Sequence, residues 1–150
     1  MHTVAEVSLK YQTNTTFQEK PLIKSPEEAA RFLREIWDQD TLEFREEFVV
    51  VLLNNAKKVL GWSKVSTGSP NTTIVHPATV FQLVLLGNAA SIILAHNHPS
   101  GKLETSLADL ELTKRLVKAG KLFSVFVDDH IILTRDGYLS MREEGLMKEG

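Results

Sequence analysis

The residues best suited to chemistry in this chain are two histidines and an aspartate. His96 and His98 end an apolar run, and Asp109 follows eleven residues after His98. Side chains two residues apart share a face of an extended chain, so both imidazoles are expected to point the same way from a strand end. The segment Pro99–Gly101 breaks the strand, and a helix that follows has Asp109 in its first turn. Two imidazoles and one carboxylate are the number and type of ligands of a catalytic zinc with an open fourth position.

Some of these residues also have a structural interpretation. Asp109 is favoured in the first turn of a helix by the helix dipole, and Ser106, three residues earlier, is a good N-cap. A single histidine is usually structural, but two on one face, followed by a breaker loop and an acid, favour metal binding. Two histidines and a carboxylate also bind iron in oxygenases, although the His-x-His order and the downstream serine and aspartate favour zinc.

A longer pattern resembles a known family. HNHPSG at His96–Gly101, then Ser106 and Asp109, and later the pair Asp129–His130, are similar to the RadC family within the JAMM (JAB/MPN/Mov34) metalloproteases. The similarity runs from about Glu47 to Leu146, which is most of the chain. The motif is specific because it fixes six or more positions rather than one pair of histidines.

This resemblance implies a fold and an activity. The fold would be α/β, or mixed α+β, with a curved JAMM/MPN-like mixed sheet, flanking helices and a layering like that of cytidine deaminases. The activity would be hydrolysis of an amide or isopeptide bond in a peptide or protein substrate, with Zn²⁺ held by His96, His98 and Asp109. Ser106 would stabilise the oxyanion of the tetrahedral intermediate.

A metal-activated water needs a general base. The resemblance implies Glu47 for this role, because the RadC pattern has a glutamate directly before the position of Phe48. Glu46 is the alternative, and strand alternation would turn its side chain to the opposite face. Without the resemblance, both glutamates would be interpreted as solvated charges at a strand end.

The remaining histidines leave alternatives open. The pair Asp129–His130 lies between two apolar runs, where it either orients a metal ligand through a hydrogen bond or forms a structural turn. His2 and His76 are expected to be surface or helix-entry histidines.

The hydrophobic pattern predicts the elements that position these residues. Apolar residues at helical spacing follow Ser25–Glu28, which has the sequence of a capping box. The near-continuous apolar run Phe48–Leu53 predicts a central strand covered on both faces. Interleaved helices and strands indicate an α/β or α+β class with a mixed sheet. Helices are predicted over 25–37, 77–87 and 106–119, the last ended by Gly120, and strands over 4–11, 46–54, 58–67, 91–95, 122–127, 131–134 and 138–140.

The predicted organisation is an N-terminal strand or arm over residues 1–24 and a RadC-like JAMM (MPN) domain over residues 25–150. The N-terminal helix-hairpin-helix region of longer RadC proteins has no evident match here. An edge strand near Val4–Tyr11 could pair with another chain, which would make a homo-oligomer.

Composition narrows the function. The 150 residues include 17 basic and 19 acidic residues, a net charge of −2, which argues against nucleic-acid binding by bulk electrostatics. DNA-repair or nucleic-acid association therefore follows from the family label alone. With no cysteine, any metal must use histidine or carboxylate ligands. The N-terminus has no signal-peptide pattern and the apolar runs are too short for a bilayer, so a cytoplasmic protein without membrane contact is expected. A non-catalytic JAMM scaffold is a further alternative, but such scaffolds typically lose the metal ligands that this chain retains.

Overall fold

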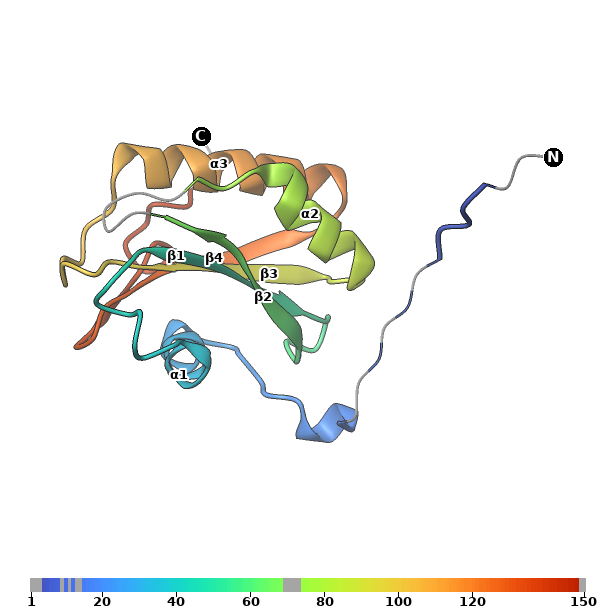
Figure 1. Ribbon diagram of the computed structural model, residues 1–150, viewed down its shortest axis with the longest axis horizontal. Helices are drawn as coiled ribbons and strands as arrows, with labels where there is room; N and C mark the ends of the chain where they lie inside the picture. Colours follow the sequence, from blue (N-terminus) through green and yellow to red (C-terminus); the bar gives the residue numbers. More distant parts are fainter. Residues whose placement is uncertain (1–3, 9, 11, 13–14, 69–73, 149–150) are drawn as a thin grey trace.

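The computed structural model describes residues 4–8, 10, 12, 15–68 and 74–148. They form a five-stranded mixed sheet with α1 on one face and α2 and α3 on the other (Figure 1). The strand order is β2-β1-β3-β4-β5, in which β3 and β4 are parallel and the other neighbours antiparallel. This confirms the predicted mixed α/β class. In chain order the elements are η1 (Phe17–Glu19), α1 (Pro26–Ile36), β1 (Glu47–Leu53), β2 (Val59–Thr67), α2 (Pro77–Leu86), β3 (Ser91–Asn97), α3 (Leu107–Leu122), β4 (Phe126–Leu133) and β5 (Tyr138–Ser140).

The two central strands, β1 and β3, are buried along their whole length, as the continuous apolar run predicts. Alternate residues of β1 enter different cores because successive side chains of a strand point to opposite faces. Val49 and Val51 pack in the core that includes Leu33 of α1. Phe48 and Val50 pack in the core beneath α2 and α3. Burial on both faces therefore fixes which β1 residues face which layer, since a one-residue slip would exchange the two sets.

The pairing of β1 with β3 sets the geometry of the polar strand ends. Phe48 lies opposite His96 in this antiparallel pair. Their rings are stacked, with centroids 6.1 Å apart and an interplanar angle of 4°. His96 therefore points into the layer between the sheet and α3. Asn97 points to the other side of the sheet, where its amide nitrogen donates to the carbonyl oxygens of Leu42 and Arg45.

Strand β4 corrects one prediction. The sequence predicts two strands separated at Asp129–His130, but a single strand runs from Phe126 to Leu133 through both residues. The polar pair is accommodated because the buried Asp129 carboxylate accepts hydrogen bonds from the Ser140 hydroxyl, at 2.5 Å, and from two backbone N–H groups. Strand β4 therefore continues through the pair, with a register irregularity against β3 between Val127 and Asp129.

The end of α3 differs from the prediction in a smaller way. The helix continues past Gly120 to Leu122. Gly120 is buried, and a Cβ atom there would collide with the backbone carbonyl of Val125. Gly120 therefore allows the backbone at Val125 to pass close to the helix. It does not end the helix.

The predicted N-terminal edge strand is wrong for the residues of this segment that the structure describes. Residues 4–8, 10 and 12 belong to no strand, and this part of the chain extends away from the sheet as an arm (Figure 1). Val4 and Val7 are 84% and 90% exposed, so the alternating pattern lacks a sheet to cover it. Leu9 and Tyr11 of the predicted strand lie outside the described residues. Within the described ranges, every helix is too short or too polar to cross a bilayer.

Candidate metal centre

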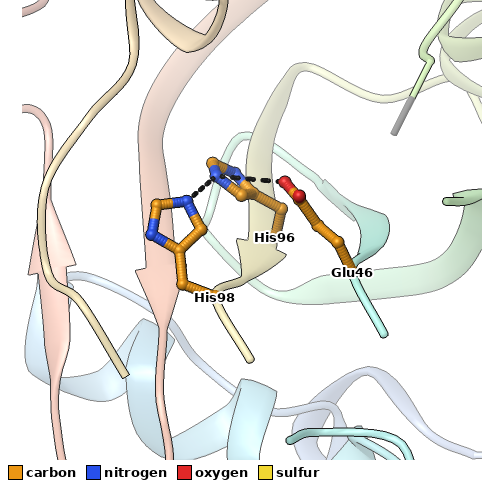
Figure 2. Close-up of side chains that lie close together, drawn as sticks. All are labelled: Glu46, His96 and His98. Carbon is orange, nitrogen blue, oxygen red and sulfur yellow. Dashed lines mark hydrogen bonds and ion pairs between the residues drawn. The ribbon is translucent and has the colours of Figure 1, made fainter. Parts of the chain in front are cut away.

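The two histidines of the motif are brought together at the end of β3. His96 lies within the strand and His98 just beyond it, and their Nε2 atoms are 2.9 Å apart (Figure 2). His96 is fully enclosed, whereas His98 is partly open to the cleft. The shared direction predicted from their spacing is therefore present in the structure.

Asp109 places a carboxylate oxygen beside the two imidazoles. Its Oδ2 lies 3.4 Å from Nε2 of His96 and 3.8 Å from Nε2 of His98. Ser106 fixes this carboxylate through a reciprocal capping box, in which the Ser106 N–H donates to Oδ2 and the Ser106 Oγ accepts from the Asp109 N–H, each at 3.0 Å. Asp109 thus belongs both to the helix cap and to the group around the histidines, and the sequence had left both roles open.

Glu46 supplies a second carboxylate. Its Oε1 is 3.8 Å from Nε2 of His96, and Figure 2 shows its side chain directed at the two imidazoles. Glu46, His96 and His98 each offer a ligand atom within 4.8 Å of the others, a spacing that could hold a metal ion. Burial raises the pKa of Glu46; the Coulombic interaction with His96 opposes this rise and the nearby Asp109 adds to it.

Glu47, the general base that the resemblance implies, lies elsewhere. Its carboxylate is fully buried on the other face of β1, 2.5 Å from Nζ of Lys64, 2.5 Å from Oγ1 of Thr41 and 3.7 Å from Nε of Arg45. Its backbone N–H donates to Oδ1 of Asn97. Burial alone would raise its pKa, but the bonds from Lys64 and Thr41 and the charges of Lys64 and Arg45 hold it below the ordinary value.

The strand register explains this exchange of the two glutamates. Phe48 lies beside His96, so the residue two positions earlier, Glu46, shares that face. Glu47 necessarily faces the opposite layer. The structure therefore brings His96, His98, Asp109 and Ser106 together with Glu46, and it does not bring Glu47 to them.

Asp109 and His98 both have pKa values below the ordinary ones. Burial would raise the pKa of Asp109, but its contact with His96 and the two bonds with Ser106 outweigh burial and hold this pKa well below its usual range. Burial lowers the pKa of His98, and this effect exceeds the opposing effect of the hydrogen bond to the Lys102 carbonyl. An ionised carboxylate and a neutral imidazole are the metal-binding forms of these groups.

The pair Asp129–His130, for which two roles stay open in the sequence, divides between the two faces of β4. Asp129 has the structural role described above. His130 is completely buried, and its Nε2 lies 2.8 Å from Nδ1 of His96. Its other ring nitrogen is 2.6 Å from Oγ1 of Thr113. Thr113 was not singled out from the sequence, although its position four residues after Asp109 places it on the same helix face.

The two histidines, Asp109 and Glu46 line a cavity of about 650 Å³ between the end of β3, the following loop and α3. Its walls are mixed in character. Phe48, Ile74, Val75 and Leu112 are apolar, whereas Arg115 places a cation on α3.

Comparison with known proteins assigns the family. The model of the family described as "RadC-like JAB domain" matches residues 23–146. This chain belongs to the RadC family. A five-stranded mixed sheet with three α-helices agrees with the JAB/MPN-like fold of that domain.

Similar full-length proteins carry no functional name. A UPF0758 protein of Rubrobacter xylanophilus is 42% identical over 129 residues, covering 85% of this chain and 55% of its own length. A UPF0758 protein of Clostridium acetobutylicum is 40% identical over 144 residues, covering 96% of this chain and 61% of its own length. The chain thus spans a little over half the length of these relatives, and their names specify no reaction.

Proposed function

We propose that this RadC domain is a zinc-dependent metallohydrolase of the JAMM type that hydrolyses amide or isopeptide bonds in a peptide or protein substrate. The observation that carries the proposal is a convergence of lone pairs. His98 Nδ1 lies 2.8 Å from the carbonyl oxygen of Lys102, which can only accept, so Nδ1 must carry the hydrogen. A neutral imidazole has one N–H, and the Nε2 of His98 therefore presents a bare lone pair to the site.

Further acceptors lie around that lone pair. They are Oδ2 of Asp109, Oε1 of Glu46 and, when Nδ1 of His96 carries the hydrogen, Nε2 of His96, all within 4 Å of at least one imidazole nitrogen. Acceptors that face one another without a donor repel, and burial increases this cost. A divalent cation at their centre would convert the repulsion into binding.

The spacing of the ligand atoms fits a small tetrahedral ion. Zinc bonds of about 2.0–2.1 Å at tetrahedral angles separate neighbouring ligand atoms by about 3.3 Å. The three separations among His96, His98 and Asp109 are 2.9, 3.4 and 3.8 Å, which bracket that value. We assign these three residues as the ligands. A bound zinc would supply Lewis acidity and lower the pKa of a water molecule towards neutrality.

Glu46 is the general base in this proposal. Its raised pKa suits a group that must accept a proton and return it, and its carboxylate adjoins the ligands. It would take a proton from the attacking water at a carboxylate oxygen and deliver it to the leaving amine. Glu47 would instead stabilise the strand end.

Ser106 would act chiefly through Asp109. Its Oγ already accepts the cap hydrogen bond from the Asp109 N–H, and its hydroxyl, which also lowers the pKa of the Asp109 carboxylate, lines the cavity. That hydroxyl could donate to the developing oxyanion.

The test is metal content and affinity. Protein purified without chelator should contain about one zinc per chain, and His98→Ala and Asp109→Ala should lose it. His76→Ala is the matched control, because His76 is an exposed histidine at the start of α2. With zinc bound, a screen of peptide and isopeptide substrates should reveal hydrolysis that Glu46→Gln abolishes. A wild-type protein that takes up no zinc would refute the proposal and favour a scaffold or nucleic-acid-associated role instead.

A further inference from the structure

A chain of three hydrogen bonds runs from His96 of the candidate metal centre into the protein interior. It runs from His96 Nδ1 to His130 Nε2, at 2.8 Å, from His130 Nδ1 to Thr113 Oγ1, at 2.6 Å, and from Thr113 Oγ1 to the backbone carbonyl of Asp109, at 2.7 Å. His96, His130 and Thr113 are all buried, so bulk water does not compete for these bonds. We infer that this chain sets the tautomer of His96 and thereby holds its Nε2 ready to bind a metal.

The donor and acceptor in each hydrogen bond follow from the last bond, which Thr113 makes to the Asp109 carbonyl. The Asp109 carbonyl can only accept, so the single hydroxyl hydrogen of Thr113 is used on it. Were that hydrogen turned towards His130, two oxygen lone pairs would face each other at 2.7 Å. The sulfur of Met141, at 3.6 Å from Thr113 Oγ1, is a much weaker acceptor.

Each earlier proton position then follows in turn. Thr113 Oγ1, having donated, can accept from His130, so the hydrogen of His130 is on Nδ1. The neutral ring then has a lone pair on Nε2, which accepts from Nδ1–H of His96. The only ring N–H hydrogen of neutral His96 is therefore on Nδ1, in the bond to His130. Its Nε2 consequently presents a lone pair to His98 and Asp109.

The two motif histidines would thus donate from Nδ1 to different partners, and each would be left with a bare Nε2. His98 donates Nδ1–H to the Lys102 carbonyl in the adjoining loop. His96 donates Nδ1–H to His130, which is a side chain of β4, and the direction of that bond is fixed from α3 through Thr113. Helix α3 therefore contributes twice, because Asp109 supplies a carboxylate to the site and a carbonyl to the end of the chain.

Thr113 and His130 are positioning residues in this account, since neither faces the cavity. The inference rests on the proposed metal site for its consequence but not for its first test. The proton positions belong to the metal-free protein, whereas the zinc-binding measurement of the wild type tests the site itself. Failure of one is distinguishable from failure of the other.

The first test is the tautomer of His96 in metal-free protein with ¹⁵N-labelled histidine. Long-range ¹H–¹⁵N spectra distinguish a protonated from an unprotonated ring nitrogen. We expect His96 and His130 both to carry hydrogen on Nδ1 and to have bare Nε2 atoms. In Thr113→Val, an isosteric change that removes the hydroxyl, His96 should shift towards the form with hydrogen on Nε2. A wild-type His96 with hydrogen on Nε2 would overturn the inference.

The second test is zinc affinity by competition with a chelating dye. Loss of a hydrogen-bond partner behind a ligand commonly reduces metal affinity by about 10–100-fold, and we expect a loss in this range for Thr113→Val and for His130→Leu. His130→Gln should recover most of the affinity, because its amide oxygen can accept from His96 where Nε2 did. Thr79→Val, the same exchange in α2, is the control.

Thermal melting of each metal-free variant would show that it is folded before its affinity is interpreted. If folded Thr113→Val and His130→Leu bound zinc as tightly as the wild type and Thr79→Val, the proposed orientation of His96 would be wrong. If all four proteins failed to bind zinc, the metal site would be refuted, while the tautomer spectra would still test the hydrogen-bond chain.

Discussion

Replacing Glu46 and Glu47 one at a time by glutamine should move the stability of the metal-free protein in opposite directions. The two residues are neighbours in sequence and both are buried, with 6% and 0% exposure. They differ in what surrounds the carboxylate. Burial, with a smaller effect of Asp109, raises the pKa of Glu46, whereas Glu47 faces Lys64 and Thr41 and has a lowered pKa. Neutralising Glu46 therefore removes an unfavourable charge, and neutralising Glu47 removes a favourable one.

The expected loss in Glu47→Gln can be bounded. Removing one partner of a fully buried ion pair costs about 3–5 kcal/mol. Here Lys64 is 38% exposed and can return to water, and glutamine can still accept from Thr41, so we expect about 1–3 kcal/mol. At about 2–4 °C per kcal/mol for a domain of this size, Tm should fall by about 2–12 °C. In Glu46→Gln the new amide can donate to the acceptors around His96, so Tm should stay level or rise.

The assay is calorimetric or fluorescence melting in the presence of chelator, followed by the same melts with zinc. Glu47→Gln should keep a zinc-induced rise in Tm and keep any hydrolytic activity per folded molecule. Glu46→Gln should lose that activity by about 10²–10⁴-fold while remaining folded. A Glu47→Gln protein with unchanged stability and no activity, beside an active Glu46→Gln protein, would show that the roles are reversed.

Three further predictions concern the scaffold of the site. Ser106→Ala should lose about 1 kcal/mol of stability with the helix cap and should also weaken zinc binding, as measured by melts and dye competition. Gly120→Ala should lower Tm by forcing Cβ against the carbonyl of Val125, at about 1–3 kcal/mol, whereas Gly61→Ala, with no heavy atom within 4 Å of the new Cβ, is the control. Glu47 has a folded-state pKa below its ordinary 4.5, so the stability it contributes is present above pH 4.5 and is lost as the pH falls through the lowered value; acid titration of unfolding should therefore be steeper for the wild type than for Glu47→Gln.

The parts of the fold that the sequence predicts well are those in which a local pattern matches its surroundings. Ser25 begins α1 by accepting a hydrogen bond from the Glu28 N–H, although the Glu28 side chain accepts from Lys24 and does not close the predicted capping box. The apolar run Phe48–Leu53 is a strand buried on both faces. In each case the hydrophobic period agrees with the final packing. The errors lie where a polar residue is satisfied by a distant partner. Asp129 resembles a turn residue until Ser140 is folded against it, and the exposed arm containing Val4 has strand periodicity without a neighbouring strand.

For the site, the sequence alone determined the residue types and the local geometry: a His-x-His pair at a strand end, and an aspartate held at N3 of a helix by its own N-cap. These relations span few residues and depend on backbone geometry that any strand or helix imposes. Only the tertiary structure decided which glutamate joins them and what lies behind His96. The first depends on the β1–β3 register, which is fixed by burial of two cores at once. The second depends on contacts between residues 17 and 34 positions apart, which only the packing of α3 and β4 around β3 creates.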